Sequence, residues 1–199
     1  MPETDAEPGG GAAIELRLEH IDRLFDPFDP FPIPTRDLAK SAEEFIVGWA
    51  RELPRDLALR IVFHLPESDA GSSTAAGLAD ALRRYFTYRA ERMTGDLHEM
   101  FRIGRQSLAI GLGVLGACIL GGRLVSSIFG ASGFSSFFVE GLVIIGWVAN
   151  WRPLEIFLYD WWPLAQRRRL YLRLAAATVE IRPSRALQAE ADVAKGRAT

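Results

Sequence analysis

The chain has 199 residues, of which 49% are hydrophobic and 24% charged, and its formal net charge is −2. This composition excludes a disordered or collagen-like protein, and a single cysteine excludes a disulfide scaffold and a multi-cysteine metal site. The near-neutral charge gives no reason to expect nucleic acid as the principal partner. Charge is unevenly placed: residues 1–101 contain 11 basic and 19 acidic residues, whereas residues 102–199 contain 12 and 6. Hydropathy changes at the same point, so this point is a boundary in the organisation of the chain.

The N-terminal region predicts a small α/β domain. Residues 1–12 are acidic and then glycine-rich, without the basic start and apolar core of a secretory signal, so we expect a disordered tail and a head domain that stays in the cytoplasm. Residues 14–18 alternate apolar and polar side chains, and an apolar run at residues 57–65 ends at Pro66. With a helix between them, these two strands predict a βαβ unit in which they lie parallel.

The connecting helix is predicted from Asp37 to Leu53. Ser41 and Glu44 have the spacing of a capping box, which offers Ser41 as an alternative start. Four apolar residues are expected to share the buried face of this helix: Leu38, Phe45, Ile46 and Trp49.

Residues 24–34 precede this helix and contain four prolines, which forbid a helix and deny a sheet its backbone donors. They predict an extended loop with three phenylalanines, Phe25, Phe28 and Phe31. The loop is either a docking surface for a partner or a segment that these three rings pin onto their own domain, and we favour the second interpretation.

A long helix is predicted from about Thr74. Its apolar residues recur at intervals of three, four and seven and form one stripe, which contains Leu78, Leu82, Phe86, Met93, Leu97 and Phe101. No break signal separates this helix from the apolar segment after it, since Gly95 and Gly104 are tolerable within a helix.

Two apolar segments follow, and they predict a transmembrane hairpin. Residues 107–129 contain one charge, Arg123, and residues 134–151 contain one, Glu140. At ~1.5 Å per residue they extend roughly 34 and 27 Å, close to the ~30 Å of a hydrocarbon core. Basic residues flank the outer ends of both spans and are missing from the turn at 130–133, so the positive-inside rule places both termini in the cytoplasm. These basic residues are Arg102, Arg105, Arg152, Arg167, Arg168 and Arg169.

Charged and small residues within the spans are candidate contact sites. If the turn is centred between Ala131 and Ser132, Arg123 and Glu140 lie at the same depth and form an intramembrane pair. We favour this pair as a clamp that fixes the register of the hairpin, with an ion path or a partner's charge as the alternatives. One face of the first span carries a small residue at every fourth position, namely Ala109, Gly113, Ala117 and Gly121. This helix-packing face contacts either a partner or the second span.

Residues 152–185 are predicted to lie at the membrane interface and to return to the domain. Pro153 and Pro163 each suit the first turn of a helix, so we expect two bends. The first helix would lie along the interface on an apolar face formed by Leu154, Phe157, Leu158 and Trp161. The aromatic and basic anchors, which suit headgroup level and anionic lipid headgroups, are Trp151, Tyr159, Trp161, Trp162, Arg167, Arg168 and Arg169. Residues 178–182 alternate and predict a third strand, with an extended tail as the alternative, and the chain from residue 186 is an expected disordered tail.

The predicted fold class is therefore a membrane α/β protein. A small cytoplasmic βαβα domain is followed by a two-helix transmembrane hairpin, an interfacial helix and a third strand that returns to the sheet. The predicted boundaries are 13–106 for the domain with its long helix, 107–151 for the hairpin and 152–185 for the interfacial helices and strand.

Two runs of the sequence carry a resemblance. Trp151-Arg-Pro-Leu-Glu-Ile-Phe-Leu-Tyr-Asp-Trp-Trp-Pro and, upstream, Arg84-Tyr-Phe-Thr-Tyr-Arg-Ala-Glu are similar to an uncharacterised family of bacterial two-span inner-membrane proteins. The resemblance covers most of the chain apart from the two tails. It implies a multi-pass protein of the bacterial inner membrane and implies no particular activity.

No pattern in the sequence identifies an enzyme. Gly111, Gly113 and Gly116 match the spacing of a dinucleotide loop but lie inside a span with no strand before them. Three scattered histidines, and Cys118 at lipid depth, favour neither a metal site nor a nucleophile. We therefore assign no catalytic, cofactor-binding or metal-binding residue and leave enzymatic activity open.

Three functional classes remain. The preferred one is a membrane-anchored cytoplasmic interaction module, an accessory or assembly factor of a larger inner-membrane complex. Its expected partners are the lipid bilayer, anionic headgroups and either another protein or a second copy of the chain. The alternatives are a small transporter or channel built by oligomerisation, and a membrane-bound enzyme of unknown chemistry.

Overall fold

A computed structural model of the chain describes residues 12–31, 35–130, 133–185 and 187. The chain divides into two compact units, one formed by residues 1–91 and 168–199 and the other by residues 92–167. We call them the sheet unit and the hairpin unit. The two predicted tails lie outside the described residues, except for the residues at positions 12 and 187.

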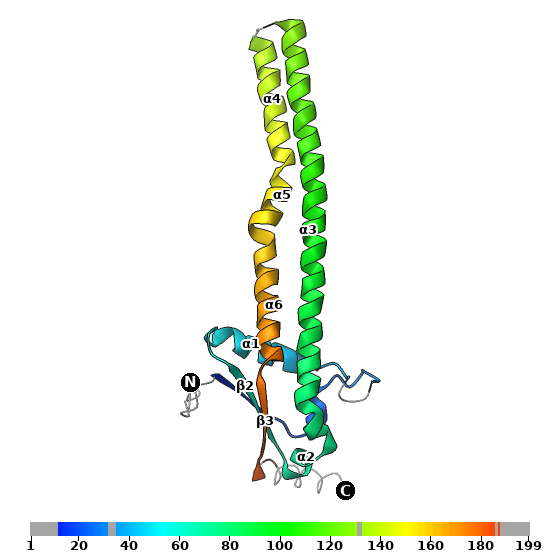
Figure 1. The fold of residues 1–199 in the computed structure, drawn as a ribbon, viewed down its shortest axis with the longest axis vertical. Coiled ribbons are helices and arrows are strands. Elements are labelled where there is room, and N and C mark those ends of the chain that lie inside the picture. The colour runs from blue at the N-terminus through cyan, green and yellow to red at the C-terminus, as the bar shows by residue number, and fades with distance from the viewer. Residues whose placement is uncertain (1–11, 32–34, 131–132, 186, 188–199) are drawn as a thin grey trace. The chain divides into compact units, whose positions relative to one another are not determined.

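The sheet unit contains a three-stranded parallel sheet in the order β1-β2-β3 (Figure 1). Its strands are β1 (Ala12–Arg17), β2 (Leu59–Leu65) and β3 (Thr178–Pro183). In the register of the sheet, Ile14 and Val179 lie on either side of Ile61. The predicted parallel pair and the predicted third strand are both confirmed.

The helices are distributed unequally between the two crossovers of the sheet. The short 3-10 helix η1 (Ile21–Leu24) and α1 (Lys40–Glu52) connect β1 to β2. All the others lie between β2 and β3: α2 (Glu67–Ala70), α3 (Ser73–Phe129), α4 (Gly133–Ala149), α5 (Trp151–Glu155), the π-helical turn η2 (Ile156–Asp160) and α6 (Trp161–Ala175). Both apolar segments are therefore insertions in the second crossover, so α3 and α6 each contribute residues to both units. The first part of α3 and the end of α6 belong to the sheet unit.

One face of the sheet carries the core of the sheet unit. Side chains alternate along a strand, so Ile14 of β1, Ile61 and Phe63 of β2 and Val179 of β3 share this face. The helices cover it with Ile46, Val47, Ala50, Leu78, Leu82, Phe86 and Leu174. The stripe predicted for the long helix is thus confirmed for its first three members.

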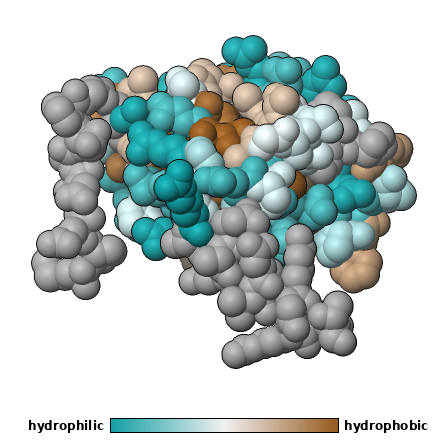
Figure 2. Space-filling view, turned by 90° about the horizontal axis from the view of Figure 1, so that it is seen from below, coloured by the Kyte–Doolittle hydropathy of each residue, from teal (hydrophilic) through white to brown (hydrophobic). Residues whose placement is uncertain are grey.

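On the opposite face of the sheet, polar side chains surround Val62, which is buried. Arg60 of β2 pairs with Glu180 of β3 at 3.2 Å, and His64 Nε2 lies 3.2 Å from the carboxylate of Glu15 on β1. Seen from the end that carries α2, the sheet unit presents mostly hydrophilic residues around a small hydrophobic area (Figure 2). Such a surface suits contact with water.

The predicted capping box of α1 is wrong, and the predicted buried face is confirmed for Leu38 and Ile46 but wrong for Phe45 and Trp49. The helix begins at Lys40 after Ala39, whose side chain makes no capping hydrogen bond, so Ser41 and Glu44 do not form a capping box. Its buried residues are Glu43, Ile46, Val47 and Ala50, whereas Phe45 and Trp49 are exposed and contact each other with ring centroids 6.0 Å apart. Hydropathy favoured Phe45 and Trp49 as buried residues, but the buried face of α1 contains the carboxylate of Glu43 instead.

The hairpin unit contains two helices that are long and apolar enough to cross a membrane. The predicted absence of a break is confirmed, since α3 is helical without interruption from Ser73 to Phe129. Close approach between α3 and α4 depends on glycine. A Cβ atom on Gly111 would lie 2.7 Å from Asn150 Oδ1, and one on Gly146 would lie 2.6 Å from Leu115 Cδ1.

The chain after α4 continues as helix in three pieces. Asn150 separates α4 from α5, and Pro153 and Pro163 lie in the first turns of α5 and α6, as predicted. Pro153 and Ile156 are buried, and a Cβ atom on Gly104 would lie 3.0 Å from Ile156 Cγ2. This segment therefore keeps packing along α3 within the hairpin unit (Figure 1).

Candidate functional site

The loop between η1 and α1 is the most unusual surface of the sheet unit, and we call residues 25–38 the aromatic loop. Its base is closed by an antiparallel bridge between Phe25 and Leu38, both buried. Phe28 and Phe31 are instead 92% and 62% exposed. The prediction that all three phenylalanines pin the loop is therefore wrong for these two, because Phe25 alone reaches the core.

Hydrogen bonds within the loop hold its described residues in shape. The carboxylate of Asp29 accepts the backbone N–H of Asp37 at 2.7 Å and that of Phe31 at 3.0 Å, and these two bonds lower the pKa of Asp29. Asp26 accepts the N–H of Phe28 at 2.9 Å. The two exposed rings are thus carried on an ordered backbone. Residues 32–34 lie outside the described residues.

Two open clefts border the aromatic loop, with volumes of about 440 and 420 Å³. Asp37 and Tyr85 line both of them. The first cleft is also lined by Asp29, Phe31, Arg36, Arg84 and Tyr88, and the second by Asp26, Lys40, Glu44, Arg51, Arg89 and Tyr171. Both clefts carry acidic and basic side chains in similar numbers, so neither has the uniform charge that attracts a strongly charged ligand.

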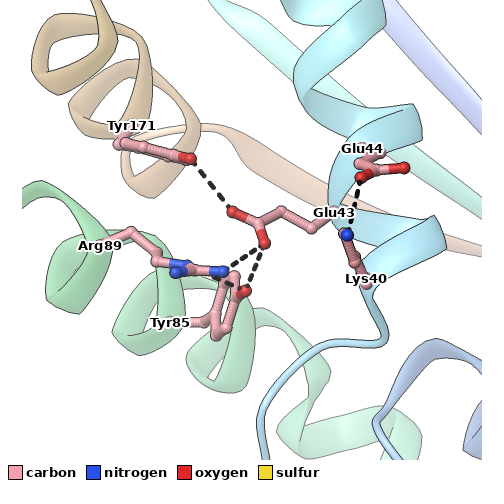
Figure 3. Close-up of polar contacts among 6 residues, drawn as sticks. All are labelled: Lys40, Glu43, Glu44, Tyr85, Arg89 and Tyr171. Carbon is pink, nitrogen blue, oxygen red and sulfur yellow. Dashed lines mark hydrogen bonds and ion pairs between the residues drawn. The ribbon is translucent and has the colours of Figure 1, made fainter. Parts of the chain in front are cut away.

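A buried carboxylate lies at the wall of the second cleft (Figure 3). Glu43 of α1 is 8% exposed and accepts hydrogen bonds from three side chains. Tyr85 donates its hydroxyl at 2.9 Å and Arg89 donates Nη2 to one oxygen, while Tyr171 donates its hydroxyl to the other at 3.1 Å. Because Tyr85 and Arg89 belong to α3 and Tyr171 to α6, this carboxylate ties three helices together.

The surroundings of Tyr85 keep it neutral. Burial, followed by its hydrogen bond to Glu43, raises the pKa of Tyr85 above the ordinary value. The hydroxyl also accepts a hydrogen bond from Nε of Arg89 at 3.0 Å, and the guanidinium carbon lies 5.3 Å from the centre of the tyrosine ring. This phenol therefore serves as a hydrogen-bond donor in the neutral pH range.

The arrangement around Glu43 favours a structural role. Each carboxylate oxygen accepts at least one hydrogen bond, and together the three bonds hold Glu43 between α1, α3 and α6. Sequence reasoning missed this cluster. The available signal was the spacing of Glu43 with Ile46, Val47 and Ala50, which places a carboxylate on the core face of α1.

The structure does not bring the predicted intramembrane pair together. Arg123 and Glu140 are both exposed, and no ion pair joins them among the described residues. The register of the helices explains part of the difference. Gly122 lies against Val139, so the position opposite Arg123 is Phe138 rather than Glu140.

Of the predicted helix-packing face, Gly121 approaches the second span, whereas Ala109, Gly113 and Ala117 face away from it. Ala109, Gly113 and Ala117 are exposed, and a Cβ atom on Gly113 would meet nothing within 4 Å. Gly121 is half-buried, and a Cβ atom on it would lie 3.8 Å from Leu142 Cδ1. The approach to the second span uses other residues of α3, spaced at four and seven, namely Gly111, Leu115 and Gly122. A four-residue repeat drifts around the helix, whereas this spacing stays on one side of it.

The predicted interfacial anchors are mostly exposed. Trp151, Tyr159 and Trp162 are 65%, 71% and 57% exposed, while Trp161 is half-buried and donates Nε1 to the carbonyl of Phe157 at 3.0 Å. Arg167 and Arg169 are exposed and Arg168 is partly buried. Of the predicted interfacial face, Leu154 and Leu158 are exposed, and Phe157 instead stacks on Phe101 of α3 with centroids 6.1 Å apart.

The remaining chemically versatile residues lie apart from one another. His20 contacts Asp69, His64 contacts Glu15, and His98 is exposed on α3. Among the described residues, no group of three or more His, Cys, Asp or Glu side chains is arranged to hold a metal ion. Cys118 is buried in the hairpin unit.

No protein-family model, curated protein sequence or solved structure matches this chain.

Proposed function

We propose that this chain is a membrane-anchored interaction protein, in which the hairpin unit is the anchor and the sheet unit binds another protein through the aromatic loop. The observation that carries the proposal is the exposure of Phe28 and Phe31, whose backbone N–H groups are held by the carboxylates of Asp26 and Asp29. Burial of one phenylalanine side chain is worth about 1.5–3 kcal/mol. A partner that covers both rings gains this energy and orders little that is not already ordered.

The residues of the aromatic loop indicate which kind of protein surface would bind it. Two aromatic anchors call for apolar pockets, because buried aromatic rings supply most of the energy of a protein interface. Asp26, Asp29 and Asp37 surround them, whereas Arg36 is the one basic residue of the described part of the loop. Complementary charge therefore favours a partner with basic residues around its pockets.

The membrane half of the proposal is supported by the hairpin unit. Its two helices are apolar, and their large side chains are exposed rather than buried, as lipid contact requires. Basic residues before α3 enters its apolar part and after α4 support the cytoplasmic location that we propose for both termini, with the hairpin in a bacterial inner membrane. The proposed role is an accessory or assembly factor that holds a cytoplasmic docking surface beside a larger membrane complex.

Site-specific photo-crosslinking in living cells tests the docking surface. A photo-reactive residue replaces Phe28 or Phe31 in turn, and the matched control replaces Glu52, which is exposed at the end of α1. We expect both loop positions to form an adduct with the same protein and the control to form none. The adduct at position 31 should also fall at least tenfold when Phe28→Ser is added.

Other outcomes contradict the proposal. Adducts with lipid alone, or the same adduct at position 52, would exclude the aromatic loop as a protein-docking surface. Fractionation of the same cells tests the anchor separately, since a chain released from membranes by alkaline carbonate would not be an integral membrane protein.

A further inference from the structure

Two charged residues in the apolar helices have no partner among the described residues. Arg123 of α3 and Glu140 of α4 are exposed, and within the part of the chain that the structure describes neither forms a hydrogen bond or an ion pair. Each is the one charged residue of its apolar segment. A charge in contact with hydrocarbon is unfavourable, so such residues ordinarily face protein or water.

Helix geometry puts both charges on one side of the hairpin at nearly one depth. Gly122 and Val139 face each other across the antiparallel pair, and Arg123 and Glu140 are the next residue on each helix. Viewed along the hairpin, successive residues of α3 and of α4 rotate in opposite directions around their helix axes, because the helices run antiparallel. The residue that follows each contact residue therefore points to the same side of the hairpin. Arg123 lies one residue nearer the turn than Gly122, and Glu140 lies one residue further from it than Val139. At about 1.5 Å per residue on each helix, the two charges differ in depth by only about 3 Å.

We propose that two copies of this chain associate side by side in the membrane, with Arg123 of each copy paired to Glu140 of the other. Copies inserted with the same topology are related by an axis along the membrane normal, and rotation about that axis preserves depth. A two-fold rotation turns this side of one hairpin onto the same side of the other. It also places α3 of each copy opposite α4 of the other, so both ion pairs form at once.

Apolar residues on the same side can complete the contact. Leu112 and Ile119 precede Arg123 by eleven and four residues, and Ile144 and Trp147 follow Glu140 by four and seven, so each pair lies in line with its charge along the helix. All four are between 44% and 65% exposed. The proposed interface is therefore an apolar strip with two buried ion pairs near the turn of the hairpin.

This inference rests on the membrane placement of the hairpin, which belongs to the proposed function, and not on the aromatic loop. Co-purification of two differently tagged copies from membranes in mild detergent tests it. Arg123→Glu and Glu140→Arg should each reduce co-purification with a copy carrying the same change at least tenfold. Co-expression of one copy carrying Arg123→Glu with one carrying Glu140→Arg should restore the wild-type yield, because both intermolecular pairs are then opposite in charge.

A matched control places the same charge on another side of α3. Leu124 is the next residue and is 61% exposed, so Leu124→Glu should leave co-purification within twofold of the wild type. A monomeric wild-type chain in carbonate-washed membranes would overturn the inference alone. So would single variants that co-purify like the wild type, or recovery only when both changes are placed in one chain and not when they are mixed. A wild-type chain that carbonate extracts would overturn both this inference and the anchor.

Discussion

The sheet unit and the hairpin unit are both rich in apolar residues, but they use these residues in opposite ways. The sheet unit buries its largest side chains, such as Phe25, Phe63 and Phe86. The hairpin unit exposes Ile110 and Leu120 at 69% and 67% and packs its helices through glycine. Water drives apolar side chains inward, whereas lipid gives no such drive and leaves close backbone approach as the main source of packing energy.

The two units also treat buried polar groups differently. The carboxylate of Glu43 in the sheet unit accepts three hydrogen bonds. In the hairpin unit, Asn150 donates Nδ2 to the carbonyls of Gly111 and Gly146 at 3.1 and 2.9 Å, while its Oδ1 has no donor among the described residues. The first arrangement joins side chains from three helices, and the second joins one side chain to backbone. Removal of each should therefore affect only its own unit.

The largest effect is expected for Glu43→Ala in the sheet unit. The substitution leaves the guanidinium of Arg89 and two tyrosine hydroxyls without their acceptor, and we expect it to destabilise the unit by about 3 kcal/mol. Arg89 is partly exposed and can turn toward water, which keeps the effect at the lower end of the range for a broken buried pair. Hydrogen exchange of the β2 amides measures it, with about 100-fold faster exchange expected.

Glu44→Ala is the matched control for this prediction. Glu44 is the next residue, and its side chain is 69% exposed and 3.8 Å from Lys40. Its removal should change the stability by less than about 0.5 kcal/mol. Equal effects of the two substitutions would contradict the assignment of Glu43 as the tie between α1, α3 and α6, and altered exchange in the hairpin unit would contradict the independence of the two units.

The next effect is expected for Gly111→Ala in the hairpin unit. A methyl group there would lie 2.7 Å from Asn150 Oδ1 and 2.9 Å from the carbonyl oxygen of Ala149, so the helices must separate. We expect a loss of about 2 kcal/mol. The control is Gly113→Ala, where the added Cβ would meet nothing within 4 Å, and which should be neutral or slightly stabilising because alanine favours helix. Unfolding by SDS in mixed micelles, followed by tryptophan fluorescence, compares the two, and equal losses would show that α3 and α4 do not approach at Gly111.

The difference between the sheet unit and the hairpin unit also explains which features could be predicted from the sequence. Strands, parallel order and the long uninterrupted helix follow from local pattern, and the structure confirms them. The buried face of α1 could not be predicted by hydropathy, because Glu43 becomes acceptable there only when Tyr85 and Tyr171 arrive from distant parts of the chain. The prediction for the aromatic loop was wrong for a related reason. Nothing in the local sequence distinguishes Phe25, which is buried, from Phe28, which is exposed.

The hairpin unit was predictable in outline and not in detail. Long apolar segments separated by a short turn indicate two helices whatever their neighbours are. The contact face depends on rotation of one helix against the other, and the four-residue repeat from Ala109 selected a side of α3 that faces away from α4. Likewise, the similar depth of Arg123 and Glu140 could be predicted from the position of the turn. The direction in which each side chain points depends on which residues of α3 and α4 face each other, and this the sequence does not specify.

The smallest effect is a pH dependence confined to the sheet unit, and it comes from Tyr85. Burial raises the pKa of this phenol in the folded chain, whereas in the unfolded chain it ionises near pH 10. Above pH 10 the unfolded state loses a proton that the folded state keeps, so the stabilisation is complete below pH 10 and is lost as the pH rises. At pH 11 the loss should reach about 1.4 kcal/mol relative to pH 9. Urea unfolding followed by near-UV circular dichroism measures it, and Tyr85→Phe, although less stable at both values, should lose about 1.4 kcal/mol less between them. If the two proteins lost stability equally over this interval, Tyr85 would ionise as readily in the fold as in the unfolded chain, and the hydrogen bond to Glu43 would not survive in solution.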